Sequence, residues 1–201
     1  MGRHYIPELM KYLCFAMLGV FILDLLPLRS ASELLYFNRE LILQGQIWRL
    51  ITFVALPPTG SLFFILINLY FYYFLGTALE NRWGSARFNI YYAIGVLGNI
   101  VAGFLTGMAT NYYLNLSLLL CFAMLYPEMQ FTLFFFLPVK VKWIGIADAV
   151  ILLYSFLVSP LSGKVALIFS LLPFFLFFGK DVWLEMKMAW KRLQWHINQR
   201  R

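Results

Sequence analysis

Hydrophobic positions along the chain fall into six apolar runs, separated by short stretches that carry charge, proline or glycine. The runs lie at about residues 11–28, 60–79, 88–108, 111–126, 143–159 and 164–179. Each is close to the roughly 20 residues that an α-helix needs to cross the hydrocarbon core of a bilayer. A further apolar stretch, 131–138, is too short to cross and is expected to extend the fourth helix or lie at the interface. The pattern predicts an all-α membrane protein with six spanning helices.

The stretch between the first and second runs mixes apolar and charged residues. It opens with Ser30-x-x-Glu33, a spacing typical of a capping box at the start of a helix. Leucine, phenylalanine and isoleucine follow, with Arg39 and Glu40 among them. We therefore expect this outer loop to contain an amphipathic helix that lies partly in the outer leaflet.

The C-terminal stretch also carries apolar residues at helical spacing, with basic residues between them. The apolar residues are Trp183, Met186, Trp190, Leu193 and Ile197. We expect residues 1–180 to form the membrane domain and residues 181–201 to form a basic amphipathic helix at the cytoplasmic membrane surface. A helix that binds a partner protein is the alternative for this tail.

Composition supports a membrane protein and limits its chemistry. Hydrophobic residues make up 62% of the chain and charged residues 12%, about half the charged fraction of a soluble domain. The net charge of +7 comes from basic residues in loops and in the tail, which predicts contact with anionic lipid and not with nucleic acid. Cys14 and Cys121 lie inside apolar runs without ligand-like spacing, so we expect no disulfide, metal or cofactor.

The distribution of lysine and arginine predicts the orientation in the membrane. With six spans, both termini lie on the same side, together with the loops after the second and fourth runs. That side carries Arg3, Lys11, Arg82, Arg87, Lys140, Lys142 and the basic tail, whereas the other side carries Arg29, Arg39, Arg49 and Lys164. The positive-inside rule therefore places both termini in the cytoplasm. We expect the first run to be a retained span; a cleaved signal peptide ending near residues 30–32 is the alternative.

The third run carries small residues at intervals of four. Gly95, Asn99, Gly103 and Gly107 form one stripe on a helix. In lipid, such stripes let helix backbones approach closely. We expect this helix to lie at the centre of the bundle.

The surroundings of the second run carry a more specific pattern. Its residues are a Trp48-Arg49 pair ahead of the run, Asn68 within it, and Gly76-x-x-x-Glu80-x-x-x-Gly84 at its end. The joint pattern resembles the rhomboid superfamily, in which the asparagine also stands eight residues before the first glycine. The resemblance covers about residues 10–180 and implies a six-helix rhomboid-like bundle.

Rhomboid proteases cleave peptide bonds inside the membrane with a serine in Gly-x-Ser-Gly on the fourth helix and a histidine on the sixth. Here the serine of the fourth run, Ser117, lies between leucines, and Phe64 stands where the family has an oxyanion-assisting histidine. The two histidines, His4 and His196, lie near the chain ends. A serine hydroxyl is a poor nucleophile until a nearby base takes its proton, so the chain is expected to lack protease activity.

By resemblance, the chain is a rhomboid pseudoprotease, similar in fold to derlins. The resemblance implies binding of transmembrane client proteins at a lateral opening between the second and fifth helices. One alternative is an active intramembrane serine protease that uses Ser117 in an unorthodox site. Another is a membrane scaffold or transporter unrelated to rhomboids.

Two acidic residues near span ends are expected to have structural roles. Glu80 is expected to accept hydrogen bonds from loop amides or to pair with Arg82 or Arg87, which fixes the turn into the third helix. Asp148, in the fifth run, is expected to stay hydrated or to pair with a neighbour, for which Lys140 and Lys142 are the candidates.

Overall fold

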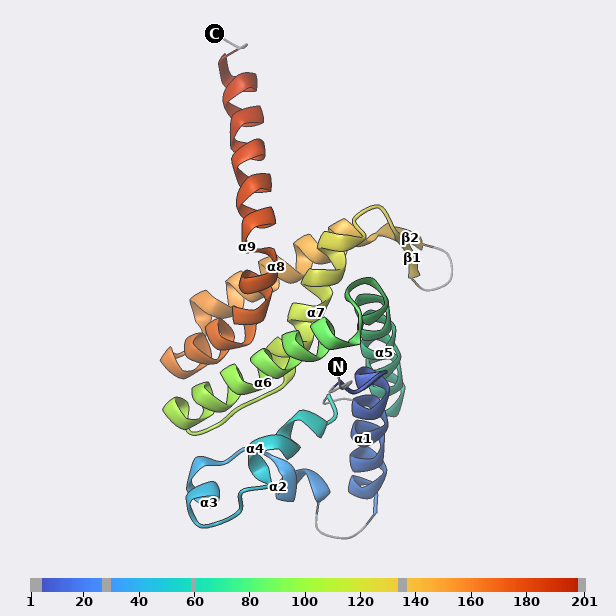
Figure 1. The fold of residues 1–201 in the computed structure, drawn as a ribbon, viewed down its shortest axis with the longest axis vertical. Coiled ribbons are helices and arrows are strands. Elements are labelled where there is room, and N and C mark those ends of the chain that lie inside the picture. Colours follow the sequence, from blue (N-terminus) through green and yellow to red (C-terminus); the bar gives the residue numbers. More distant parts are fainter. Residues whose placement is uncertain (1–4, 27–29, 59–60, 134–136, 199–201) are drawn as a thin grey trace.

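The computed structural model describes residues 5–26, 30–58, 61–133 and 137–198, and these residues are mostly helical (Figure 1). The helices and strands are α1 (Leu9–Asp24), α2 (Ala31–Leu35), α3 (Arg39–Leu43), α4 (Arg49–Thr52), a 3₁₀ turn (Phe53–Ala55), α5 (Leu62–Trp83), α6 (Ser85–Thr106), α7 (Tyr112–Leu125), β1 (Gln130–Leu133), β2 (Leu137–Lys140), α8 (Val141–Val158) and α9 (Leu161–Asn198). Helix α6 lies beside the first half of α9 on one side and beside α5 on the other, whereas α7 packs directly on α5, with the Phe74 and Phe122 ring centroids 5.7 Å apart (Figure 1).

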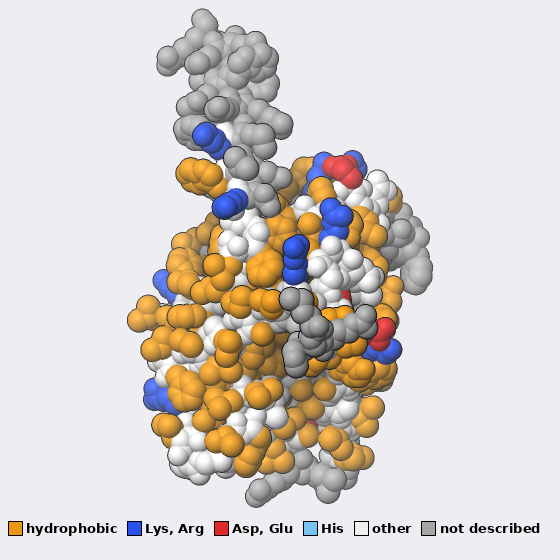
Figure 2. All heavy atoms as spheres, in the orientation of Figure 1, with side chains coloured by type: hydrophobic (Ala, Val, Ile, Leu, Met, Phe, Trp, Pro, Cys, Tyr) orange, Lys and Arg blue, Asp and Glu red, His pale blue; other side chains and the backbone are white. Residues whose placement is uncertain are grey.

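Four helical segments are long and apolar enough to cross a membrane: α5, α6, α8 and residues Leu161–Lys180 of α9. Helix α7 is apolar but has 14 residues, and α1 has 16. Hydrophobic side chains cover much of the visible face of the bundle (Figure 2). The chain is therefore a multi-pass integral membrane protein with four candidate spans among the described residues.

The described parts of the short apolar stretch after α7, 131–133 and 137–138, lie in strands, so they do not extend the fourth helix, which was one of the two expectations. Strands β1 and β2 pair antiparallel, with Gln130 opposite Lys140 and Phe131 opposite Val139. Pro127 lacks a backbone N–H and follows the last turn of α7, so the helix does not continue. The Phe131 ring packs on Phe71 and Phe74 of α5, with ring centroids 5.3 Å apart in both pairs.

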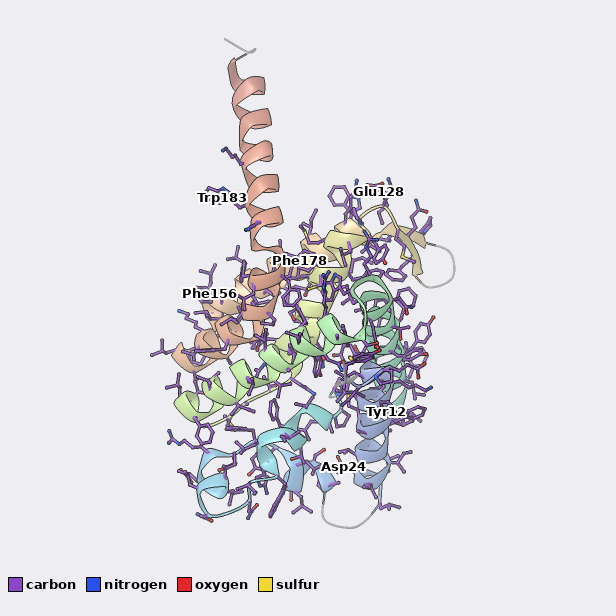
Figure 3. The ribbon with its side chains drawn as sticks, viewed as in Figure 1. Tyr12, Asp24, Glu128, Phe156, Phe178 and Trp183 are labelled. Carbon is purple, nitrogen blue, oxygen red and sulfur yellow. The ribbon has the colours of Figure 1, made fainter. Side chains whose placement is uncertain are left out.

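The outer loop also differs from the single amphipathic helix that was predicted, since α2, α3 and α4 are short and separate. Ser30 precedes α2, but its hydroxyl does not cap that helix and instead donates to Asp24 Oδ1 over 3.0 Å. The same carboxylate oxygen accepts the Ser32 N–H, also over 3.0 Å. Asp24, at the end of α1 and facing α2 (Figure 3), thus provides the cap that the Ser30-x-x-Glu33 spacing suggested.

The Trp48-Arg49 pair holds the other end of α2. The last carbonyl groups of a helix have no partner within it, and here side chains from α4 and the residue before it bind them. Arg49 Nη1 donates to the Glu33 and Tyr36 oxygens over 3.0 and 2.9 Å. Trp48 Nε1 donates to the Leu34 carbonyl over 3.2 Å, and Thr52 Oγ1 donates to the Leu35 carbonyl over 3.0 Å. These contacts fix the outer loop against the bundle.

A close approach of helix backbones joins α6 and α9. A Cβ atom at Gly98 would lie 2.7 Å from the Phe169 carbonyl oxygen. Four residues later Pro173 lies inside α9 and has no N–H to bind that carbonyl, which leaves the oxygen free to face α6. Beside it, Ser170 Oγ donates to Asn99 Oδ1 over 2.8 Å.

The small-residue stripe has several different neighbours. Gly95 lies against Leu114 of α7 and Gly103 against Phe37 of the outer loop. Gly107 lies beyond the end of α6 with a φ of 94° and ends that helix. Gly98, which the stripe does not include, makes the backbone contact with α9.

Helix α9 is continuous from Leu161 to Asn198 and runs without interruption across residue 180, where the tail was predicted to begin. Its C-terminal part projects away from the bundle (Figure 1). Phe178 lies where the helix leaves the bundle, and Trp183, 66% exposed, lies on the projecting part (Figure 3).

Candidate functional site

Ser117, the candidate nucleophile, lies on the buried face of α7 with 0% of its surface exposed. Its hydroxyl donates to the Leu114 carbonyl over 2.6 Å, so the 2.7 Å contact with Tyr91 is made by the tyrosine hydroxyl as donor. Cys121 Sγ in turn donates to the Tyr91 oxygen over 3.2 Å. The three side chains form a chain of hydrogen bonds that ends on a backbone carbonyl.

No basic partner of Ser117 is present in the described part of the chain. Its hydrogen bonds involve only Tyr91 and the Leu114 carbonyl. His4 lies outside the described residues, and His196 lies on the projecting part of α9. Eighteen residues separate His196 from Phe178, which corresponds to about 27 Å along a helix. The described contacts of Ser117 are thus a tyrosine hydroxyl and a backbone carbonyl.

The family positions on α5 face away from this network. Asn68 Nδ2 donates to the Phe64 carbonyl of its own helix over 2.8 Å, and the contact is exposed. The Phe64 ring is 60% exposed, as are large parts of neighbouring apolar side chains on α5. No hydrogen bond joins Asn68 to Ser117 among the described residues. The exposed face of α5 is therefore an apolar surface that contains Phe64.

The Gly76-x-x-x-Glu80-x-x-x-Gly84 motif connects three helices. A Cβ atom at Gly76 would lie 2.2 Å from Met10 Cγ, so the glycine allows α1 to approach α5. Glu80 is 8% exposed; its Oε1 accepts the Glu8 N–H over 2.8 Å and also binds the Ser85 hydroxyl. Gly84, with a φ of 82°, forms the turn into α6. A carboxylate that accepts two donors in this way ties the starts of α1 and α6 to the end of α5.

The predicted ion pairs of two acids are not observed. Of the two alternatives expected for Glu80, the structure shows the hydrogen bond from a backbone amide, that of Glu8, and no salt bridge to an arginine among the described residues. Lys140 and Lys142 bind Glu128, over 2.6 and 3.1 Å, and not Asp148. Asp148 is 3% exposed, and its Oδ2 has no hydrogen-bond partner in the described structure.

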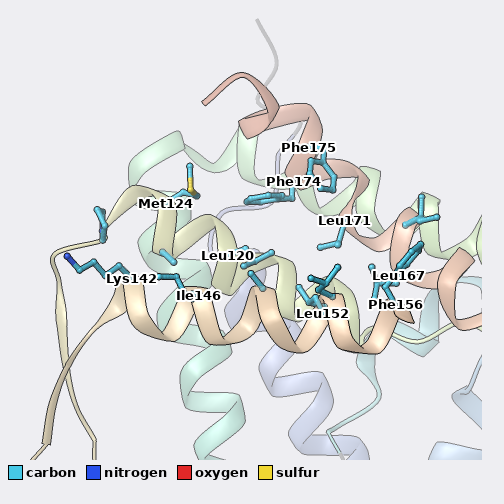
Figure 4. Close-up of a pocket in the computed structure, with 16 residues that line it drawn as sticks. Leu120, Met124, Lys142, Ile146, Leu152, Phe156, Leu167, Leu171, Phe174 and Phe175 are labelled. Carbon is cyan, nitrogen blue, oxygen red and sulfur yellow. The ribbon is translucent and has the colours of Figure 1, made fainter. Parts of the chain in front are cut away.

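A groove of about 650 Å³ lies between α7, α8 and α9 (Figure 4). Lys142 lies at one end, Phe156 and Leu167 lie near the other, and Phe174 and Phe175 of α9 form one wall (Figure 4). This place differs from the opening between the second and fifth helices that the resemblance implies. Within the described residues, no three His, Cys, Asp or Glu side chains are grouped as metal ligands would be.

Comparison with known proteins supports the resemblance over the middle of the chain. The family model described as the rhomboid domain matches residues 44–125. Rhomboid-like protease 1 of Toxoplasma gondii is 32% identical over 97 residues, which are 46% of this chain and 30% of that protein. The chain thus matches less than a third of the length of this relative. The family match runs from the end of α3 to the end of α7 and includes the Trp48-Arg49 pair, the Glu80 motif and Ser117.

Proposed function

We propose that this chain is a rhomboid-family membrane protein without protease activity that binds transmembrane segments of other membrane proteins. The proposed lack of protease activity rests on the burial of Ser117 in a hydrogen-bond network that ends on the Leu114 carbonyl. A nucleophile must reach its substrate and transfer its proton to a base. Ser117 has neither a free path to a peptide bond nor a described base.

The proposed binding of transmembrane segments rests on the exposed apolar face of α5. In the proposed arrangement, Phe64 replaces a histidine that would act in catalysis, and its ring is available for contact with an apolar segment. Helix association in lipid relies on such side-chain packing and on close backbone approach. We also place both termini in the cytoplasm, on the basis of the lysine and arginine distribution.

Site-specific photocrosslinking tests client binding. A photoreactive residue replaces Phe64 on α5, and a matched variant carries it at Leu97, which is equally exposed but lies on α6. The expected result is a discrete adduct from Phe64, whose peptide maps to a transmembrane segment of another protein. Equal background capture at Phe64 and Leu97 would contradict client binding at this face.

A further inference from the structure

The groove between α7, α8 and α9 is an elongated hollow in a surface that faces lipid. Its walls are apolar, and Lys142 alone is charged among the described residues that line it. The exposed residues on α8, among them Val150, Leu153 and Leu157, are apolar as well. An apolar hollow on a membrane-spanning helix is filled by hydrocarbon or by another apolar segment.

Its size favours a narrow occupant. The volume of about 650 Å³ lies within the range of about 300–1,000 Å³ that is typical of small-ligand sites. A ten-residue helical segment with side chains, about 10 Å wide and 15 Å long, occupies about 1,200 Å³. The groove is therefore too small to enclose a helix but large enough for a hydrocarbon chain.

Its length and position also fit a lipid chain. Lys142 is the second residue of α8, and Phe156 lies near the other end of the same helix. The separation of fourteen positions between them corresponds to about 21 Å along the helix axis. One leaflet contributes about 15 Å to the hydrocarbon core. A chain that starts at Lys142 thus fits within the groove, and its headgroup lies at the end of the span.

Charge at that end favours an anionic headgroup. Lys140 and Lys142 share the single carboxylate of Glu128, which leaves one net positive charge at the mouth of the groove. The side chains of both lysines are about 40% exposed, so their ammonium groups can contact a phosphate while they remain paired with Glu128. We propose that the groove binds an acyl chain of an anionic phospholipid, with the phosphate at Lys140 and Lys142. This site is independent of client binding on α5.

Two alanines of α8 provide a matched pair for the test. Ala149 lines the groove, whereas Ala147 is also exposed and, two residues away, points to the opposite side of the helix. Ala149→Trp fills the groove, and Ala147→Trp adds the same side chain to the lipid-facing surface. Lys142→Gln removes the charge at the proposed headgroup end. Lys164→Gln removes the lysine that lies 5.8 Å from the Phe156 ring, at the other end.

The full chain is reconstituted in vesicles of equal phosphatidylglycerol and phosphatidylcholine, extracted into detergent, and examined by native mass spectrometry. We expect retained phosphatidylglycerol in the unchanged chain and in Ala147→Trp and Lys164→Gln. We expect Ala149→Trp to lose the bound phosphatidylglycerol. In Lys142→Gln the amount of bound phosphatidylglycerol should decrease about fivefold, which is the effect of one lysine at a membrane surface. Thermal unfolding of the two tryptophan variants checks that both are folded.

Equal retention in Ala149→Trp and Ala147→Trp, or a loss in Lys164→Gln without one in Lys142→Gln, would overturn the proposal. A photoreactive residue at position 149 tests the occupant directly. Its crosslink to phospholipid supports the proposal, whereas a crosslink to a transmembrane segment or to a second copy of this chain overturns it.

Discussion

Arg49 and Asp148 are both ionisable side chains with only 3% of their surface exposed, and they differ in what surrounds their polar atoms. Arg49 donates to Gln46 Oε1 over 2.7 Å and to two carbonyls of the outer loop, and its guanidinium lies 4.9 Å from the centre of the Tyr36 ring. Asp148 Oδ2 has no partner in the described structure. Buried polar groups are normally paired, so Arg49 has a structural explanation and Asp148 has none.

The difference separates two parts of the molecule. In the outer loop and at the end of α5, the motif residues Arg49 and Glu80 bind backbone groups of other segments. On α8, a buried acid lies in an apolar environment without such a bond. The rhomboid-like motif residues therefore act as connections between segments, and substitution should affect them far more than Asp148.

Arg49→Ala is expected to have the largest effect. It removes the hydrogen bonds from a charged group to the Glu33 and Tyr36 carbonyls, each worth about 1.5–3 kcal/mol, so the variant should lose about 4 kcal/mol. Arg49→Lys should restore only part of this, because an ammonium lacks the planar fork that reaches several acceptors. Denaturation in mixed micelles, followed by circular dichroism, measures both; a loss below about 1 kcal/mol in Arg49→Ala would contradict the assignment.

Glu80→Ala should come next. The carboxylate accepts the Glu8 N–H and the Ser85 hydroxyl, and hydrogen bonds to a charged group contribute about 1.5–3 kcal/mol. We expect lower abundance and a loss of about 2–3 kcal/mol in the same denaturation assay, with a smaller loss in Glu80→Gln. Glu40→Ala, an exposed acid on α3, serves as the control and should be unchanged. An unchanged stability of Glu80→Ala would contradict the role of this carboxylate in connecting α1 and α6.

Asp148→Leu should not destabilise the protein. Replacing an unpaired buried polar group by an apolar one is neutral or favourable, by about 1 kcal/mol here. Asp148→Asn keeps the shape of the side chain and serves as a control for steric crowding by the larger leucine. A clear loss of stability in both variants would show that Asp148 is paired, and the contrast with Arg49 would no longer hold.

The smallest effect is expected at Glu128, whose exposed carboxylate joins the end of α7 to β2 and α8. Hydrogen bonds from Lys140 and then Lys142 lower the pKa of this carboxyl below its ordinary value of 4.5. Its contribution to stability is therefore complete above that value and disappears as the pH falls through the lowered folded-state pKa. Glu128→Gln should flatten the dependence of the unfolding midpoint on pH between about 5 and 3; an unchanged dependence would count against the ion pair.

The long elements could be predicted because continuous apolar runs need no tertiary information. The run at 143–159 corresponds to α8, Val141–Val158, and residues 62–79 of the run at 60–79 form most of α5, Leu62–Trp83. The outer loop could not be predicted, because its form depends on Trp48 and Arg49 donors that reach backbone groups 13–16 residues earlier in the chain. Helical spacing contains no signal for such contacts.

The candidate site shows the same limit. The absence of glycines beside Ser117 was visible in the sequence and indicated a structural hydroxyl. Its hydrogen bond with Tyr91, which in turn accepts one from Cys121, was not visible, because Tyr91 comes from another helix. The close contact of Gly98 with α9 was also missed, since a stripe at intervals of four excludes Gly98. This contact involves the Phe169 carbonyl, which is free to face α6 because Pro173 has no N–H.

The central claim is that Ser117 does not act as a nucleophile. Its most direct test is labelling of the full chain in membranes with a serine-reactive fluorophosphonate, in parallel with Ser117→Ala. The buried hydroxyl predicts the same background signal from both proteins. Labelling of the unchanged chain that is lost in Ser117→Ala would contradict the account and establish an unorthodox serine protease site.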